Sequence, residues 1–220
     1  MAYKNRRKTN KVKGESIIAY TAPRSKISEQ YRSLRTNLQL SSSIHKSRTI
    51  VITSPRYGEG KSTITVNLAV SIAQKGEKVL IIDANLRTPT IQEMFGVENT
   101  VGLTDILNGK TNLEGAVKKT EMERLDVLTS GPVPFNPSEV LSSDEMDMLI
   151  QKAMEQYDII LFDSSPVLEV TDTSVLVDKC EGVLLVIRYN RTVSEDALET
   201  KRALSFTKSR ILGVILNGKV

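Results

Sequence analysis

The residues with the clearest chemical potential lie in one loop, residues 54–63, which reads Ser-Pro-Arg-Tyr-Gly-Glu-Gly-Lys-Ser-Thr. The loop follows an apolar run and precedes a segment with helical spacing of its apolar residues. Glycines let a backbone curl so that successive N–H groups face one anion, and the N-terminus of a helix adds its dipole. The loop therefore predicts a binding site for the phosphates of ATP and its magnesium ion, formed by Gly58, Glu59, Gly60, Lys61, Ser62 and Thr63.

Individual side chains of this loop have separate expected roles. Lys61 is expected to reach the β- and γ-phosphates, and the Ser62 hydroxyl to join the magnesium shell, with Thr63 nearby. The general pattern has glycine at position 55, where this chain has proline. The position of Arg56 resembles that of a signature lysine in ATPases of the MinD and ParA type, which contacts the nucleotide of a neighbouring subunit. Arg56 therefore has two interpretations: a similar finger that neutralises transition-state charge, or a solvated loop arginine.

Two aspartates end apolar runs elsewhere in the chain. The runs at 79–82 and 159–162 lead directly to Asp83 and Asp163. Magnesium on a triphosphate usually takes one or two carboxylates and keeps several waters. We therefore expect Ser62, Asp83 and Asp163 to hold the metal, with Asp83 also orienting an attacking hydroxyl; a plain solvent-facing strand end is the alternative. Asp172 is a further candidate for the same pocket.

Short apolar runs and amphipathic segments alternate along the chain. The runs are rich in Ile, Val and Leu and apolar at nearly every position, which is typical of strands covered on both faces. The sequence thus predicts an α/β fold of the P-loop NTPase type, with a parallel sheet flanked by helices on both faces. Expected strands are 49–53, 79–83, 125–128, 159–163, 183–187 and 211–216, and expected helices are 28–40 with Ser28 as N-cap, 62–74, 144–156 and 194–207.

The net charge of +4 belongs to one end of the chain. Six basic residues and no acid precede Gly14, and removing them from the 30 basic residues leaves 24 against 26 acidic ones, a net charge of −2. We expect a flexible basic tail over 1–24 and one domain over 25–220, and no binding to nucleic acid. The tail is either a solvated leader or a segment attracted to anionic lipid or to an acidic partner.

Composition favours a cytoplasmic protein. No run approaches the ~18 apolar residues of a membrane span, and the N-terminus has no signal-peptide pattern. Cys180 is the only cysteine, is expected to be buried, and fits a reducing compartment. His45 is the only histidine and has no companion for a metal site, so we expect it in a solvated loop.

Taken together, the motifs resemble the bacterial tyrosine kinases, a phosphate-loop family that regulates capsule and exopolysaccharide synthesis. The resemblance covers roughly residues 25–219. It rests on Ile-Ile-Asp-Ala-Asn-Leu-Arg at 81–87, Leu-Thr-Ser-Gly-Pro at 128–132, Asn-Pro-Ser-Glu at 136–139, Asp-Ser-Ser-Pro at 163–166 and Gly-Val-Ile-Leu-Asn at 213–217. It implies a tyrosine kinase that uses ATP and Mg2+, with an adenine contact at Asn217 and a catalytic set of Lys61, Asp83, Asp163 and Arg87.

The resemblance also implies partners. The segment 29–35 resembles the family's Glu-x-x-Arg-x-x-Arg helix, through which kinase domains assemble into a ring, and here it contains Glu29, Arg32 and Arg35. The same spacing would also give ordinary intrahelical pairs of about 0.2–0.5 kcal/mol. Gram-positive members are separate from the transmembrane adaptor that activates them, so we expect recruitment to the cytoplasmic face of the membrane, with protein tyrosines as substrates.

Two departures from the family pattern leave the function open. Asn85 stands where the family has a second aspartate, and a terminal tyrosine cluster does not precede Val220. The tyrosines are scattered, at positions 3, 20, 31, 57, 157 and 189. The leading hypothesis is a tyrosine kinase. The alternative is a weakened, ATP-binding switch or scaffold that controls assembly of the polysaccharide export machinery; a MinD-like membrane-cycling ATPase is disfavoured because it usually needs an amphipathic C-terminal helix.

Overall fold

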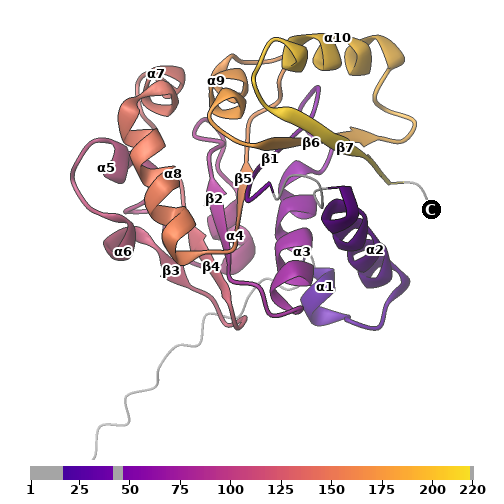
Figure 1. Ribbon diagram of the computed structural model, residues 1–220, viewed down its shortest axis with the longest axis horizontal. Coiled ribbons are helices and arrows are strands. Elements are labelled where there is room, and N and C mark those ends of the chain that lie inside the picture. Colours follow the sequence, from indigo (N-terminus) through magenta and orange to yellow (C-terminus); the bar gives the residue numbers. More distant parts are fainter. Residues whose placement is uncertain (1–16, 42–46, 219–220) are drawn as a thin grey trace, which may run out of the picture.

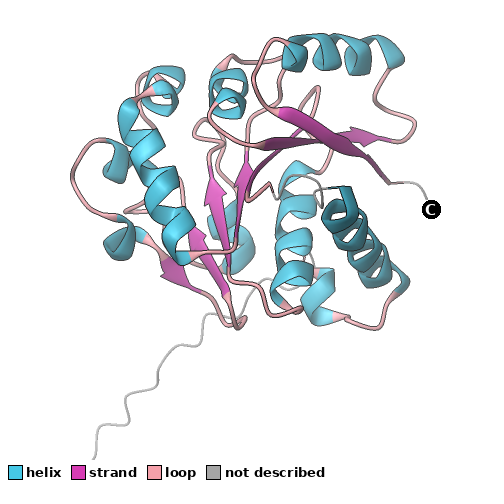
Figure 2. Cartoon of the chain, in the orientation of Figure 1, coloured by secondary structure: helices cyan, strands magenta, loops and turns pink. Residues whose placement is uncertain are grey.

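The computed structural model describes residues 17–41 and 47–218 of the 220-residue chain. Strands and helices alternate along most of this length (Figures 1 and 2). The strands are β1 (Thr49–Thr53), β2 (Val79–Asp83), β3 (Lys118–Lys119), β4 (Leu125–Leu128), β5 (Ile159–Asp163), β6 (Gly182–Arg188) and β7 (Arg210–Asn217). The helices are α1 (Ile18–Thr21), α2 (Lys26–Ser41), α3 (Lys61–Ala73), α4 (Ile91–Phe95), α5 (Leu103–Leu107), α6 (Leu113–Ala116), α7 (Pro137–Ser142), α8 (Asp144–Gln156), α9 (Asp172–Asp178) and α10 (Ser194–Ser205).

The strands form one sheet in the order β3-β4-β2-β5-β1-β6-β7. All neighbours pair in parallel except β3, which runs antiparallel to β4. The predicted parallel sheet is therefore confirmed for its six longer strands, and the two-residue β3 is an addition at the edge. Strand β5 lies between β1 and β2 in the sheet, although it follows both of them in the sequence. The segment that connects β1 to β2 therefore passes over the position that β5 occupies.

Both faces of the sheet are covered by helices because the side chains of each buried strand alternate between two apolar layers. In β2, Val79 and Ile81 join a cluster with α1 to α4, while Leu80 and Ile82 join a cluster with α5 to α10. Every residue of β1 and β2 is buried. The continuous apolar runs that predicted strands covered on both faces thus correspond to strands at the centre of a three-layer fold.

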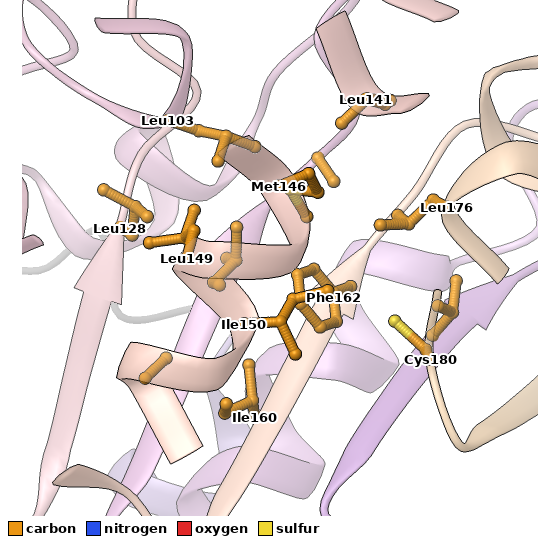
Figure 3. Close-up of a cluster of buried hydrophobic side chains, with 14 of the residues drawn as sticks. Leu103, Leu128, Leu141, Met146, Leu149, Ile150, Ile160, Phe162, Leu176 and Cys180 are labelled. Atoms are coloured by element: carbon orange, nitrogen blue, oxygen red, sulfur yellow. The ribbon is translucent and has the colours of Figure 1, made fainter. Parts of the chain in front are cut away.

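The apolar cluster that contains Leu80 and Ile82 is centred on α8 and β5. Figure 3 shows Met146, Leu149 and Ile150 of α8 facing the side of β5 that carries Ile160 and Phe162. Cys180 belongs to this cluster, so its predicted burial is confirmed, and burial raises the pKa of its thiol. No helix of the described part is long and apolar enough to cross a membrane.

The described chain begins inside the segment 1–24 that was assigned to a tail. Ile17 is fully buried, and α1 packs against α3. Helix α2 starts at Lys26, and Ser25 accepts a hydrogen bond from the backbone N–H of Ser28 at 3.2 Å. The prediction of Ser28 as N-cap is therefore wrong: its hydroxyl donates instead to the carbonyl of Ala22 at 2.7 Å. His45 and the six basic residues before Gly14 lie outside the described residues.

Candidate active site

The phosphate loop joins the end of β1 to the start of α3, in the middle of the sheet's carboxyl edge (Figure 1). Gly58 and Gly60 have φ angles of +79° and +96°, which side chains disfavour. A Cβ at Gly60 would lie 2.2 Å from Nδ2 of Asn217, so this position has no room for one. The backbone therefore needs glycine here both for its conformation and for the close approach of β7.

Lys61 lies at the first position of α3 and is 6% exposed. Burial lowers the pKa of Lys61, while the charges of Asp163 and Glu59 oppose this shift. Its ammonium lies 5.7 Å from the centroid of the Tyr57 ring, within the range of a cation–π contact. The structure thus holds a partly desolvated cation at the loop, where an anionic phosphate would offset its burial.

Asp163 ends β5 beside the loop and is fully buried. The Ser62 hydroxyl donates to its Oδ2 at 2.6 Å, and the Thr65 hydroxyl approaches its Oδ1 at 3.3 Å. Burial raises the pKa of Asp163, and these two hydroxyls and Lys61 oppose the shift. Ser62 and Asp163, predicted from separate motifs, are therefore direct neighbours.

Asp83 pairs in register with Asp163 across β2 and β5, so the two carboxyl groups lie side by side at the ends of adjacent strands. Its Oδ2 accepts the backbone N–H groups of Thr90 and Ile91, each at 3.0 Å, and its Oδ1 accepts that of Asn85 at 3.2 Å. Burial, followed by the charge of Asp163, raises the pKa of Asp83. Within the described residues Asp83 forms no ion pair.

This donor set fits a magnesium ion that is shared with a nucleotide. Two buried carboxylates and a serine hydroxyl are hard oxygen ligands, and Lys61 is the cation that the structure places against them. Across the described ranges, no group of three or more His, Cys, Asp and Glu side chains could hold a metal unaided. Phosphate oxygens and waters would therefore supply the remaining ligands, as is usual for magnesium.

Asn85 is 4% exposed and fully engaged by neighbours. Its Nδ2 donates to the Thr88 carbonyl at 2.9 Å, and its Oδ1 accepts the hydroxyls of Ser165 at 2.9 Å and Thr88 at 3.2 Å. Asn85 stands where the family motif has aspartate. This departure therefore lies beside Asp83 and is held by a hydrogen bond from Ser165.

The predicted arginines of the site are both paired within the chain. Arg87 donates two hydrogen bonds to the carboxylate of Asp172, at 2.7 and 3.0 Å, and Asp172 is buried at the start of α9. Asp172, the further candidate for the same pocket, is therefore a direct neighbour of Arg87. Arg56 pairs with Asp196 at 2.6 Å and with Glu169 at 3.3 Å. Arg56 is therefore half exposed but not a free loop side chain.

Asn217, the last residue of β7, contacts the phosphate loop directly. Its Nδ2 donates to the carbonyl of Glu59 at 2.8 Å. The side chain of Glu59 is buried, and its Oε1 accepts the Thr192 hydroxyl at 2.7 Å. Thr63 lies in the first turn of α3, where its carbonyl oxygen accepts a hydrogen bond from Asn67 Nδ2. The structure thus brings the predicted loop residues, Asn217 and the two strand-end acids to one edge.

The predicted assembly helix has one exposed and one inward-facing part. Arg32 pairs with Glu29 and with the Pro23 carbonyl on the surface of α2. Arg35 instead turns toward α3, where its Nη1 donates to the Ser71 carbonyl at 2.6 Å. Part of the Glu-x-x-Arg-x-x-Arg motif therefore joins α2 to α3 within the chain.

Sequence reasoning missed several residues of the site. Thr65 lies one helical turn after Lys61, so its spacing could have indicated its contact with Asp163. Ser165 and Thr192 carry no such signal, because their partners come from distant segments. Two cavities of about 720 and 310 Å³ lie at the opposite, amino edge of the sheet and are lined by none of the predicted site residues.

Comparison with known proteins identifies the family that the sequence motifs resemble. A sequence model of the AAA domain family matches residues 47–198. A tyrosine-protein kinase of Bacillus subtilis, YwqD, is 48% identical over 93% of this chain and 86% of its own length. The tyrosine-protein kinase CpsD of Streptococcus agalactiae is 35% identical over 87% of this chain and 82% of its own. This chain belongs to the bacterial tyrosine-protein kinases.

Solved structures of this kinase family share the fold. The kinase domain of the Escherichia coli tyrosine kinase ETK superposes with a TM-score of 0.89 at 33% identity, over 93% of this chain and 80% of that one. The chimerical protein CapA2B2 gives 0.88 at 36% identity, over 91% and 88%. MinD of Pyrococcus horikoshii, solved with Mg-ADP, gives 0.65 at 30% identity over 77% and 69%. The family therefore extends the MinD-like phosphate-loop fold.

Proposed function

We propose that this chain transfers the γ-phosphoryl group of ATP to tyrosine hydroxyls of proteins, at the edge formed by the phosphate loop, Asp83 and Asp163. One observation carries the proposal. The Ser62 hydroxyl lies 2.6 Å from Asp163, and Asp83 lies beside Asp163 on the next strand. A phosphate-binding loop, a set of magnesium ligands and a second carboxylate for the acceptor thus share one place.

The residues of the site have separate roles in this reaction. Bound Mg·ATP supplies the phosphoryl group and a metal charge that offsets its negative charge. The N–H groups of residues 58–61 and the Lys61 ammonium would bind the phosphates, while Ser62, Asp83 and Asp163 would hold the metal. Asp83 accepts a hydrogen bond from the tyrosine hydroxyl and orients its oxygen. Positioning and electrostatics, rather than covalent chemistry by the protein, supply the rate enhancement.

The setting follows from the relatives. By family, we place the kinase in the regulation of capsular or exopolysaccharide synthesis, on the cytoplasmic side of the membrane, with a transmembrane adaptor as activator. We also propose assembly into a homo-oligomeric ring through the exposed part of α2, including Glu29 and Arg32. Arg56 would act on a neighbouring nucleotide only after it leaves Asp196 and Glu169.

Phosphotyrosine formation tests the proposal. The purified chain, with and without a candidate adaptor tail, is incubated with labelled ATP and Mg2+, and phosphotyrosine is mapped by mass spectrometry. We expect label on tyrosine in the unmodified chain and at least a hundredfold less in Lys61→Met. Equal label in both proteins would refute the assignment.

The environment of Asn85 supports a second candidate function. An amide at this position carries no charge near the metal, and its hydrogen bonds hold it firmly in place. A chain of this kind could couple ATP occupancy to assembly without rapid phosphoryl transfer. This alternative predicts nucleotide-dependent oligomerisation, measured by light scattering, with no phosphotyrosine even in the presence of the adaptor tail.

A further inference from the structure

The 188–193 loop, which comprises the last residue of β6 and the residues that lead to α10, contacts the phosphate loop at points that the proposed reaction does not use. Arg188 Nη1 donates to the Gly58 carbonyl oxygen at 2.8 Å, and Arg191 Nη1 donates to the same oxygen at 3.1 Å. Thr192, in the same loop, holds the buried Glu59 carboxylate. Three consecutive contacts therefore join this loop to Gly58 and Glu59.

The 188–193 loop is built to hold its shape. The Thr192 hydroxyl accepts the backbone N–H of Arg188 at 2.7 Å, and the Arg188 carbonyl accepts the N–H groups of Arg191 and Thr192 at 3.1 and 3.0 Å. Asn190 has a φ of +55°, in the left-handed region. The loop thus closes on itself and carries two arginines in a fixed relation.

The close approach of Arg191 depends on the absence of a side chain at position 58. A Cβ at Gly58 would lie 2.8 Å from Arg191 Nη1 and 3.0 Å from its Nη2. Two guanidinium groups converge on one carbonyl oxygen here, although each guanidinium has five N–H donors. Most of their hydrogen-bonding capacity therefore stays available at the rim of the phosphate loop.

Their charge is also uncompensated. Neither Arg188 nor Arg191 lies within 4 Å of a carboxylate of the described residues, whereas Arg56 nearby has two such partners. Both residues are exposed to solvent. Two positive charges therefore lie close together and share only a neutral carbonyl oxygen. This arrangement favours binding of a ligand with several negative charges.

We propose that Arg188 and Arg191 are nucleotide-binding residues of this kinase. Their charge attracts the polyphosphate, and their shared bond to the Gly58 carbonyl keeps that oxygen turned away while the N–H groups of the loop face the phosphates. This inference rests on the proposed function, since it places the nucleotide at the same loop. It adds a second basic element to Lys61, contributed by a segment about 130 residues further along the chain.

The test is the dissociation constant of Mg·ADP, measured by calorimetry at 50 and 500 mM NaCl. Removing both charges in Arg188→Gln with Arg191→Gln is expected to weaken binding about tenfold at low salt and less at high salt, because screening shortens the Debye length from about 14 Å to about 4 Å. Each single variant is expected to weaken binding about threefold. Arg202→Gln, an exposed arginine in the last turn of α10, is the control and should stay within twofold.

A double substitution to lysine separates charge from packing, and thermal unfolding confirms that each variant is folded. We expect the double lysine variant to bind within about threefold of the unmodified chain. Equal affinity of the unmodified and double glutamine proteins at both salt concentrations would overturn the inference. So would a lysine variant as weak as the glutamine one. Failure of the unmodified chain to bind Mg·ADP would instead refute the proposed function.

Discussion

Replacing Asn85 by aspartate, the residue of the family motif, should destabilise the nucleotide-free protein. The substitution removes the amide donor from the Thr88 carbonyl and places a third carboxyl group next to Asp83 and Asp163. Loss of a buried hydrogen bond that leaves a polar group unsatisfied costs about 1–3 kcal/mol. Repulsion from the neighbouring carboxylates adds about 1 kcal/mol more, because burial raises the pKa of both Asp83 and Asp163 and protonation can relieve part of the repulsion.

We therefore expect the free energy of unfolding of Asn85→Asp to fall by about 2–4 kcal/mol without magnesium, which corresponds to a Tm lower by about 5–10 °C. The assay is urea unfolding, with and without Mg·ADP. A divalent cation offsets the added charge, so Mg·ADP should restore more stability to the variant than to the unmodified chain.

Two further variants make this reasoning refutable. Asn108→Asp also removes a side-chain amide hydrogen bond, from Asn108 Nδ2 to the Thr104 carbonyl at 2.7 Å, but at an exposed position. This substitution should cost under ~1 kcal/mol. Ser165→Ala removes the donor to Asn85 and should cost more in the Asn85→Asp background, where that bond is charge-assisted. If Asn85→Asp without magnesium is as stable as the unmodified chain, the hydrogen-bond network does not constrain this position. The same variants, assayed for phosphotyrosine, show whether the natural residue limits turnover.

Three other outcomes follow from single contacts. Gly60→Ala should weaken Mg·ADP binding about 10–100-fold by calorimetry, because it adds backbone strain and a clash with Asn217. The control is Gly76→Ala, at a φ of +103° with no atom within 4 Å of the added Cβ, which should leave the affinity unchanged. Asp172→Asn should lower kcat about tenfold by freeing Arg87, with little change in the KM for ATP. Unchanged kcat would show that this pair does not position the site. The control is Asp178→Asn, which loosens only Lys208. The Cys180 thiol should react with a disulfide reagent only after unfolding, since burial raises its pKa, and fast labelling of the folded chain would contradict the packing around α8.

The sequence was most informative where one chain segment determines its own structure. The predicted strands 49–53, 79–83, 125–128 and 159–163 match β1, β2, β4 and β5, because uninterrupted runs of Ile, Val and Leu indicate burial on both faces. Predicted helix 144–156 matches α8 for a different reason, because its apolar residues recur with a helical period. The short helices α4 to α7 and the two-residue β3 were not predicted, since four to six residues carry no readable period.

Contacts between distant segments could not be predicted. The motifs indicated that Ser62 and Asp163 share a site, because both follow buried strands at one sheet edge. Nothing local indicated that Asp196 pairs with Arg56 or that Ser71 holds Arg35, which depend on how α10 and α3 pack. Predicted roles of Arg87, Arg56 and Asn217 remain predictions, although Arg56 belongs to the phosphate loop and Asn217 contacts it.

The insertion of β5 between β1 and β2 makes nucleotide binding a report on completed folding. The loop after β1 and the acid at the end of β2 belong to the first 83 residues, but a strand formed some 75 residues later must enter between them before Asp163 reaches Ser62. A chain fragment or a refolding intermediate that lacks this central strand would present a phosphate loop without Asp163. Magnesium nucleotide should therefore select the fully assembled sheet and slow its opening.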